Sequence, residues 1–213
     1  AALRGVAVDG LVCNAGSYDG GVGPKAAGPK QIFAAQKLEA VSTQMMRATF
    51  EVNTLGPLRC VLALLPQLTS PGGRIAIIST QACSPPRVAG MLPPPRLRAH
   101  RMLLVLCSAQ MGSIDDNTSG GSYAYRTSKA AVNMVGRSLA CDLKERGIAV
   151  SLIAPGFVVS SFGPGEKAMK KMGARAVEPS VLGVVQAIDA MTVERSGNFV
   201  HANYGQGLKQ SMW

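Results

Sequence analysis

The chain has 213 residues, 47% of them hydrophobic, which is enough for one domain with a sizeable core and argues against a disordered protein. Its net charge of +10 would suit nucleic acid, but the 5% aromatic content and the lack of a recognised binding motif argue against that partner. No apolar run approaches the ~18 residues of a membrane helix, and no signal-peptide core opens the sequence. The five cysteines show no C-x-x-C spacing, which favours a reduced protein without a zinc site. We therefore expect a cytoplasmic protein that binds no membrane.

The first predicted element is a short apolar strand at 11–13, which runs into the sequence Asn14-Ala15-Gly16. Asn and Gly both tolerate positive φ, so these residues predict a tight turn. The Gly- and Pro-rich segment 17–30 predicts a flexible loop. It contains a G-x-G-x-x-A pattern from Gly21, but the Gly-Pro pair at 28–29 would break the helix that a phosphate-binding turn must open, so we expect no phosphate site there.

The next element is an apolar helix that carries a polar residue, Asn53, within the segment 51–57. The helix continues with apolar residues at Leu58, Val61 and Leu65. A polar side chain midway along such a helix must find hydrogen-bond partners. Asn53 therefore either packs between helices or belongs to a functional site.

Two segments compete for the central position in the sheet, 74–79 and 102–107. We predict that 74–79 fills it, because this segment is rich in β-branched isoleucine, and that 85–101 is looped out. The intervening residues are rich in Pro and Arg, unlike their surroundings. The segment at about 80–110 is therefore either a retained intron or gene-model error, which we favour, or a genuine insertion at a strand end.

Tyr125 and Lys129 stand four residues apart in a pattern that predicts a helix. Residues at this spacing share one helix face, with Cβ atoms about 6 Å apart. A cation that close is expected to lower the pKa of the tyrosine from its usual value of about 10. The tyrosine could then exchange a proton with a carbonyl or alcohol near neutral pH.

After this helix, Gly147 is placed as a C-cap, and the apolar segment 148–154 predicts a buried strand that ends at Pro155-Gly156. A helix, a short turn and an apolar strand in succession are typical of a parallel α/β sheet.

Taken together, these blocks resemble the short-chain dehydrogenase/reductase family, and within it the carbonyl reductases of the C-factor and sniffer type. The resemblance implies a Rossmann-like, doubly wound parallel sheet of the α/β class, and hydride transfer between NAD(P)H and a small carbonyl or alcohol substrate. The blocks that carry it are Cys13–Gly16, Phe50–Pro57, Gly73–Ser79, Met111–Gly121, Tyr123–Lys129, Pro155–Gly156 and Asn203–Trp213.

The resemblance also implies catalytic roles. Tyr125 would donate the proton to the carbonyl oxygen, Lys129 would lower its pKa and bind the nicotinamide ribose, and Asn53 would complete a proton relay. The family's serine position falls here on Ala109. Ser108, one residue away, and Ser79, before the insertion, are both candidates, the third alternative is that no serine acts, and the choice stays open.

Contacts to the cofactor follow from the same resemblance. Residues 162–178 would form a mobile substrate lid. The expected cofactor-binding residues are Asn14, Ala15, Gly16, Tyr125, Lys129, Pro155, Gly156 and Ser160, the last standing where the family commonly has Thr.

In the family, a glycine-rich phosphate turn lies well before Asn-Ala-Gly, so we expect residues 1–213 to form a single partial domain that lacks the first two βα units. The residue that separates NAD from NADP would lie in that part, so the sequence does not decide between the two cofactors, although NADP is favoured. An exposed sheet edge would then lead to instability, homo-oligomers or weak dinucleotide binding.

A missing N-terminus with a transit peptide would make the protein organellar. The alternative is an inactive, truncated or mis-spliced remnant that acts as a non-catalytic interaction protein.

Overall fold

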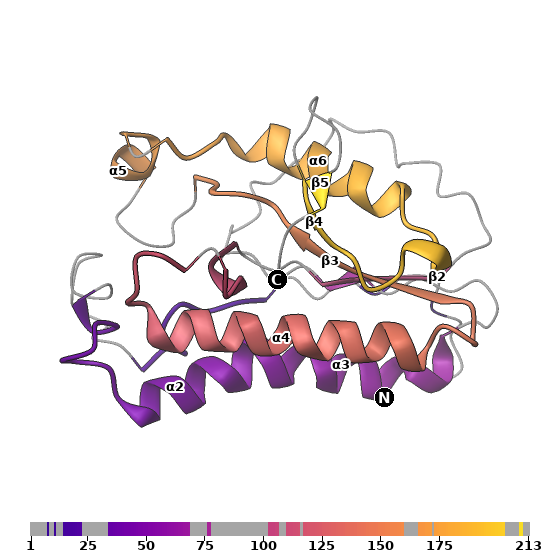
Figure 1. Cartoon of the computed structure of the whole chain (residues 1–213), viewed down its shortest axis with the longest axis horizontal. Coiled ribbons are helices and arrows are strands. Elements are labelled where there is room, and N and C mark those ends of the chain that lie inside the picture. Colours follow the sequence, from indigo (N-terminus) through magenta and orange to yellow (C-terminus); the bar gives the residue numbers. More distant parts are fainter. Residues whose placement is uncertain are drawn as a thin grey trace.

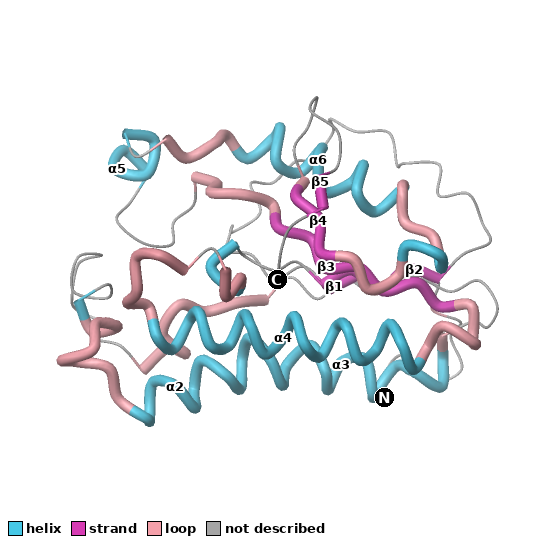
Figure 2. The backbone as a smooth tube through the Cα atoms, viewed as in Figure 1, coloured by secondary structure: helices cyan, strands magenta, loops and turns pink. Residues whose placement is uncertain are grey.

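A mostly parallel sheet lies between two layers of helices in the computed structural model (Figure 1). Helices α2, α3 and α4 cover one face of this sheet and α6 covers the other, as the magenta strands in Figure 2 show. The predicted doubly wound α/β class is therefore confirmed. The structure describes residues 8, 11, 15–22, 34–68, 76–77, 102–106, 110–115, 117–159, 166–171, 173–202 and 209–210.

The helical elements differ in length and type. The α-helices are α2 (Thr43–Phe50), α3 (Gly56–Leu64), α4 (Tyr123–Asp142), α5 (Glu166–Lys171) and α6 (Val177–Asp189). A π-helical turn, η1 (Glu51–Leu55), joins α2 to α3, and 3-10 turns lie at η2 (Leu65–Gln67), η3 (Gln110–Gly112) and η4 (Val193–Arg195). None of the helices in the described part of the chain is long and apolar enough to cross a membrane.

The strands follow the order β1-β2-β3-β4-β5, and all neighbours are parallel except β4 and β5. Their bounds are β1 (Ala76–Ile77), β2 (Met102–Leu106), β3 (Ile148–Ala154), β4 (Phe199–His201) and β5 (Lys209–Gln210).

The prediction that segment 74–79 fills the central position is wrong. Strand β2 pairs with β3 over five residues, from Met102 opposite Ile148 to Leu106 opposite Leu152, whereas β1, among the residues that the structure describes, pairs only with β2. Strand β2 is a continuous apolar run, which suits a position between two parallel strands, and it leads within a few residues to η3, the element that precedes α4. Residues 85–101, predicted to be looped out, lie outside the described residues.

Strand β3 forms the centre of the core, because all seven of its residues are buried. Its alternate residues Ile148, Val150, Leu152 and Ala154 face the cluster that includes Val132 of α4 and Val61 of α3. The other face, with Ala149 and Ile153, packs on Val184 and Ala187 of α6. A strand buried on both faces reads as a near-continuous apolar run, interrupted here by Ser151 alone, which explains why it was recognisable from the sequence.

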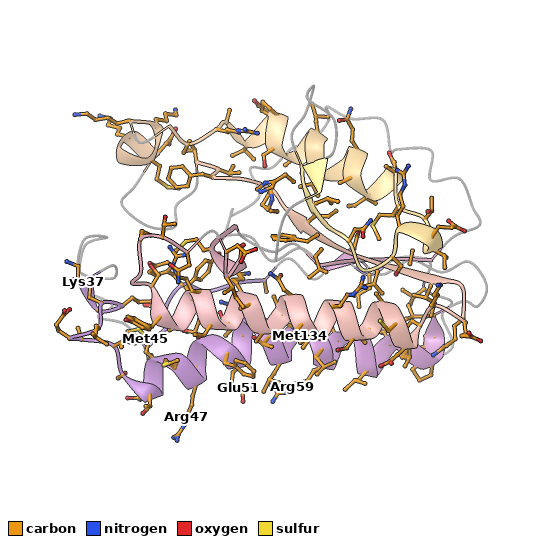
Figure 3. All side chains as sticks on the ribbon, viewed as in Figure 1. Lys37, Met45, Arg47, Glu51, Arg59 and Met134 are labelled. Carbon is orange, nitrogen blue, oxygen red and sulfur yellow. The ribbon has the colours of Figure 1, made fainter. Side chains whose placement is uncertain are left out.

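Helix α4 ends earlier than expected. Its last residue is Asp142, and Gly147 is not its C-cap but closes a turn, donating its N–H to the carbonyl of Lys144 at 3.0 Å. Gly147 has φ +68°, a conformation that glycine adopts without a Cβ clash, immediately before β3. On the outer side of the helical layer, Figure 3 shows the labelled Arg47, Glu51 and Arg59 projecting away from the sheet.

Candidate active site

Helix α4 brings Tyr125 and Lys129 together at its N-terminal end, as the spacing predicts. Both are fully buried, with 1% and 0% of their surface exposed. The Lys129 Nζ lies over the Tyr125 ring, 5.5 Å from the centroid, within the range of a cation–π interaction. The Tyr125 hydroxyl is buried without a hydrogen-bond partner among the described residues.

The expected lowering of the Tyr125 pKa is wrong for this structure. Burial of the hydroxyl raises its pKa well above the usual value, and the neighbouring Tyr18 raises it further. The physical reason is that a phenolate without water or hydrogen-bond donors is poorly solvated. The ammonium of Lys129 is placed over the face of the ring, and its effect does not outweigh this loss of solvation.

Asn53 lies in the π-helical turn η1 and is fully buried. Its Oδ1 accepts from the backbone N–H of Ser17 at 2.8 Å, and its Nδ2 donates to the Ser17 carbonyl at 2.8 Å and to Ser128 Oγ at 2.9 Å. One side chain thus connects the loop at 15–22 to α4. Ser128 completes the connection, since its Oγ donates to the Tyr125 carbonyl at 2.8 Å.

Pro155 and Gly156 directly follow β3. Because α4 runs antiparallel to β3, the N-terminal end of α4 and the carboxyl end of β3 lie at the same edge of the sheet, which is where open α/β sheets bind ligands (Figure 1). Gly156 has φ +84°, and a Cβ built there would have no atom within 4 Å. The structure therefore brings Tyr125, Lys129, Asn53, Pro155 and Gly156 to one end of the molecule.

The loop that follows the first predicted strand differs from expectation. Gly20 and Gly21 have φ +67° and +75°, whereas Gly16 is not in the left-handed region. Ala15 is exposed and Gly16 half-buried. Four predicted site residues lie outside the described residues: Asn14, Ser79, Ser108 and Ser160.

Sequence reasoning missed two residues of this site, Tyr18 and Gln36, both buried. The Tyr18 ring lies 5.0 Å from the Tyr125 ring, centroid to centroid, at an interplanar angle of 31°. Gln36 Oε1 accepts from the Tyr125 N–H at 3.1 Å, and its Nε2 donates to the Tyr18 carbonyl. A lone aromatic residue two positions after Asn-Ala-Gly was a weak signal for Tyr18; Gln36 gave none.

Comparison with known sequences places the chain in a family. The profile described as "short chain dehydrogenase" matches residues 109–171. The 1-hydroxy-2-glutathionyl-2-methyl-3-butene dehydrogenase of Rhodococcus sp. strain AD45 is 33% identical over 162 residues, 75% of this chain and 56% of that protein. C-signal of Myxococcus xanthus is 34% identical over 154 residues, 72% of each chain.

Similar solved structures support the same family assignment. The carbonyl reductase Sniffer of D. melanogaster is similar with a TM-score of 0.65 at 25% identity, over 100% of this chain and 69% of that one. A protein of the short-chain dehydrogenase/reductase type from Burkholderia multivorans with bound NADP has a TM-score of 0.66 at 28% identity, over 100% and 69%. The chain spans little more than half, 56%, of the Rhodococcus dehydrogenase. On these grounds the chain belongs to the short-chain dehydrogenase/reductase family.

Proposed function

We propose that this chain forms the catalytic part of a reductase that transfers hydride between NAD(P)H and a small carbonyl or alcohol. Besides family membership, one observation supports the proposal: the buried Tyr125 hydroxyl has no partner among the described residues, and the ammonium of buried Lys129 lies over the ring that carries it. A buried hydroxyl without a partner costs about 1–3 kcal/mol. A substrate oxygen at that place would remove this cost.

In the proposed reaction, Tyr125 donates its proton to the carbonyl oxygen as negative charge develops there. Its raised pKa keeps it protonated until such an acceptor arrives. The Lys129 ammonium then stabilises the phenolate that remains, because a preorganised cation in a water-free site acts strongly on a developing charge. Asn53 is proposed to complete the path by which the proton returns from solvent.

The open backbone at the end of β3 supports binding of a nicotinamide cofactor here. Tyr125 and Lys129 would hold its ribose, and the open backbone at Gly156, next to buried Pro155, would receive its nicotinamide end. When bound, the cofactor supplies the hydride. Ala15 and Gly16 are proposed as backbone contacts, and Asn14, Ser160 and Ser108 stay predictions outside the described residues. NADP is preferred, because the Burkholderia relative holds NADP and the chain carries a charge of +10.

The test is the reduction of small aldehydes and ketones by the purified chain with NADPH, followed by absorbance of the reduced nucleotide. Tyr125→Phe should abolish turnover, because it removes the proton donor, while circular dichroism stays unchanged. Tyr123→Phe changes an exposed tyrosine in the same helical turn and serves as the control. Undiminished activity of Tyr125→Phe would refute the proposal.

A further inference from the structure

The first turn of α4 has an unusual cap. The first backbone N–H groups of a helix lack partners within the helix and need an acceptor from outside. Ser122, at the N-cap position, makes no side-chain capping hydrogen bond and has φ +51°, the left-handed region that non-glycine residues rarely adopt. Two donors of the first turn are instead satisfied by Gln36: its carbonyl accepts from Tyr123 N–H at 3.5 Å and its Oε1 from Tyr125 N–H at 3.1 Å.

Gln36 also reaches the loop above the site. Its Nε2 donates to the Tyr18 carbonyl, so both ends of the fully buried side-chain amide are engaged. Only an amide of this length provides an acceptor at one end and a donor at the other. Lys37, the exposed neighbour of Gln36, is labelled in Figure 3 close to the start of α4, at the end of the molecule where Tyr125 lies.

Besides this link through Gln36, Tyr18 contacts Tyr125 directly. Its ring lies against the Tyr125 ring with a centroid distance of 5.0 Å, and its hydroxyl hydrogen-bonds to Ser122 Oγ. Aromatic pairs at this separation stabilise each other beyond the area they bury. The strained backbone of Ser122 is thereby held by the same residue that packs on Tyr125, and strain of this kind gathers at functional sites.

These contacts fix the Tyr125 backbone through Gln36 and its ring through Tyr18, while its hydroxyl has no partner among the described residues. A reacting group whose backbone and ring are both held is preorganised for an incoming substrate.

We propose that Gln36 and Tyr18 form a brace that positions the Tyr125 phenol for proton transfer, and that both are positioning residues for the reaction. The inference rests on the proposed function, because it assigns the brace a role in reduction of the carbonyl.

The test compares five variants of the whole chain. Gln36→Leu keeps the side-chain size and loses every side-chain hydrogen bond, whereas Gln36→Glu keeps the acceptor for Tyr125 N–H. Tyr18→Leu removes the ring contact, and Tyr18→Phe removes only the hydroxyl. Tyr123→Phe is the control, since that side chain is 36% exposed. For each we measure kcat, the KM for NADPH, the pH profile of kcat, and hydrogen exchange of the Tyr125 amide.

We expect Gln36→Leu and Tyr18→Leu to lose about 10²-fold in kcat, as small misplacements of a reacting group do, with little change in the KM for NADPH. Gln36→Glu and Tyr18→Phe should lose less. Exchange of the Tyr125 amide should accelerate in Gln36→Leu and stay slow in Gln36→Glu.

The pH profile provides a readout that a merely structural role would not move. Burial and Tyr18 raise the Tyr125 pKa, so admitting water in Tyr18→Leu should move the alkaline fall of kcat to lower pH. The charged groups placed near the pair are Lys129 over Tyr125 and Arg126, whose charge acts on Tyr18, and both remain in every variant.

An unchanged kcat in Gln36→Leu together with faster exchange would overturn the positioning role, since the residue would then only cap the helix. Unchanged exchange in Gln36→Leu would overturn the brace itself. If Gln36→Leu or Tyr18→Leu does not fold, the milder Gln36→Glu and Tyr18→Phe decide by the same measurements. A wild-type chain that reduces no carbonyl would refute the proposed function separately, and exchange of the Tyr125 amide would still decide whether the brace exists.

Discussion

Burial of the Tyr125 hydroxyl makes the stability of the fold depend on alkaline pH. Its pKa is raised in the folded chain, so the folded state keeps the proton at pH values where the unfolded chain, with a pKa near 10, releases it. The stabilisation is complete below about pH 10 and is lost as the pH rises above it, by up to about 1.4 kcal/mol per pH unit. Tyr18, whose pKa burial also raises, acts in the same direction.

We therefore expect the free energy of unfolding, measured by urea denaturation from about pH 8 to pH 11, to fall less steeply in Tyr125→Phe than in the wild type. Tyr123→Phe should keep the wild-type slope. Equal slopes in Tyr125→Phe and the wild type would mean that the hydroxyl is hydrated in solution.

Gly112 allows a close approach between η3 and α4. A Cβ at this residue would lie 2.9 Å from the carbonyl carbon and Cβ of Lys129 and 3.1 Å from Asn133 Nδ2, which donates to the Gly112 carbonyl. Gly112→Ala should therefore push η3 away from Lys129 and cost about 1–3 kcal/mol of unfolding free energy.

The matched control is Gly56→Ala in α3, where the nearest atom, the Glu51 carbonyl oxygen, would be at an ordinary 3.5 Å. There alanine should be neutral or stabilising, since it favours a helix more than glycine does. Thermal unfolding of both variants would compare the costs, and equal effects would argue against the close approach at Gly112.

Among the elements, β2 and β1 differ most clearly from the sequence prediction. Strand β2 has neighbours on both sides, whereas β1 pairs on one side within the described sheet. Proline removes a backbone donor, so it is costly in a central strand and tolerated at an edge. Proline at Leu104 or Val105 should therefore unfold the chain at lower urea than proline at Ala76 or Ile77. The reverse order would restore 74–79 to the central position.

The same elements show how far the sequence can be interpreted. Strand β3 and the Tyr125–Lys129 helix were predictable, because a near-continuous apolar run and a three-to-four-residue period are local patterns. The pairing of β2 with β3 was not, since two apolar runs of similar length fit the position and only long-range pairing distinguishes them. Tyr18 and Gln36 escaped notice because their roles come from contacts across the chain. The sign of the Tyr125 pKa shift required knowledge of burial, which spacing does not provide.

At the scale of the whole molecule, cofactor binding and stability are linked. A ligand that binds only the folded chain stabilises it by mass action, by about 2.7 kcal/mol at a hundred times its Kd. The sequence predicts that the 213 residues hold no glycine-rich phosphate turn, so we expect thermal unfolding to shift only at NADPH concentrations well above micromolar. NADH is the control, and its shift should be smaller. A rise in the unfolding temperature that is already complete at micromolar NADPH would contradict the expectation of weak binding.

The cap that Gln36 provides for α4 also constrains the order of folding. Gln36 and Tyr125 are 89 residues apart in the chain, so their hydrogen bond forms only after a long loop has closed. Closing this loop costs conformational entropy before any contact between its ends stabilises the chain. The middle of α4 can become helical from local contacts alone, while its first turn waits for the distant segment. In pulse-labelled refolding, the Tyr125 amide should gain protection later than amides in the centre of the same helix. A chain that is only partly folded would then contain the helix without an aligned phenol, so competence for proton transfer would arise last.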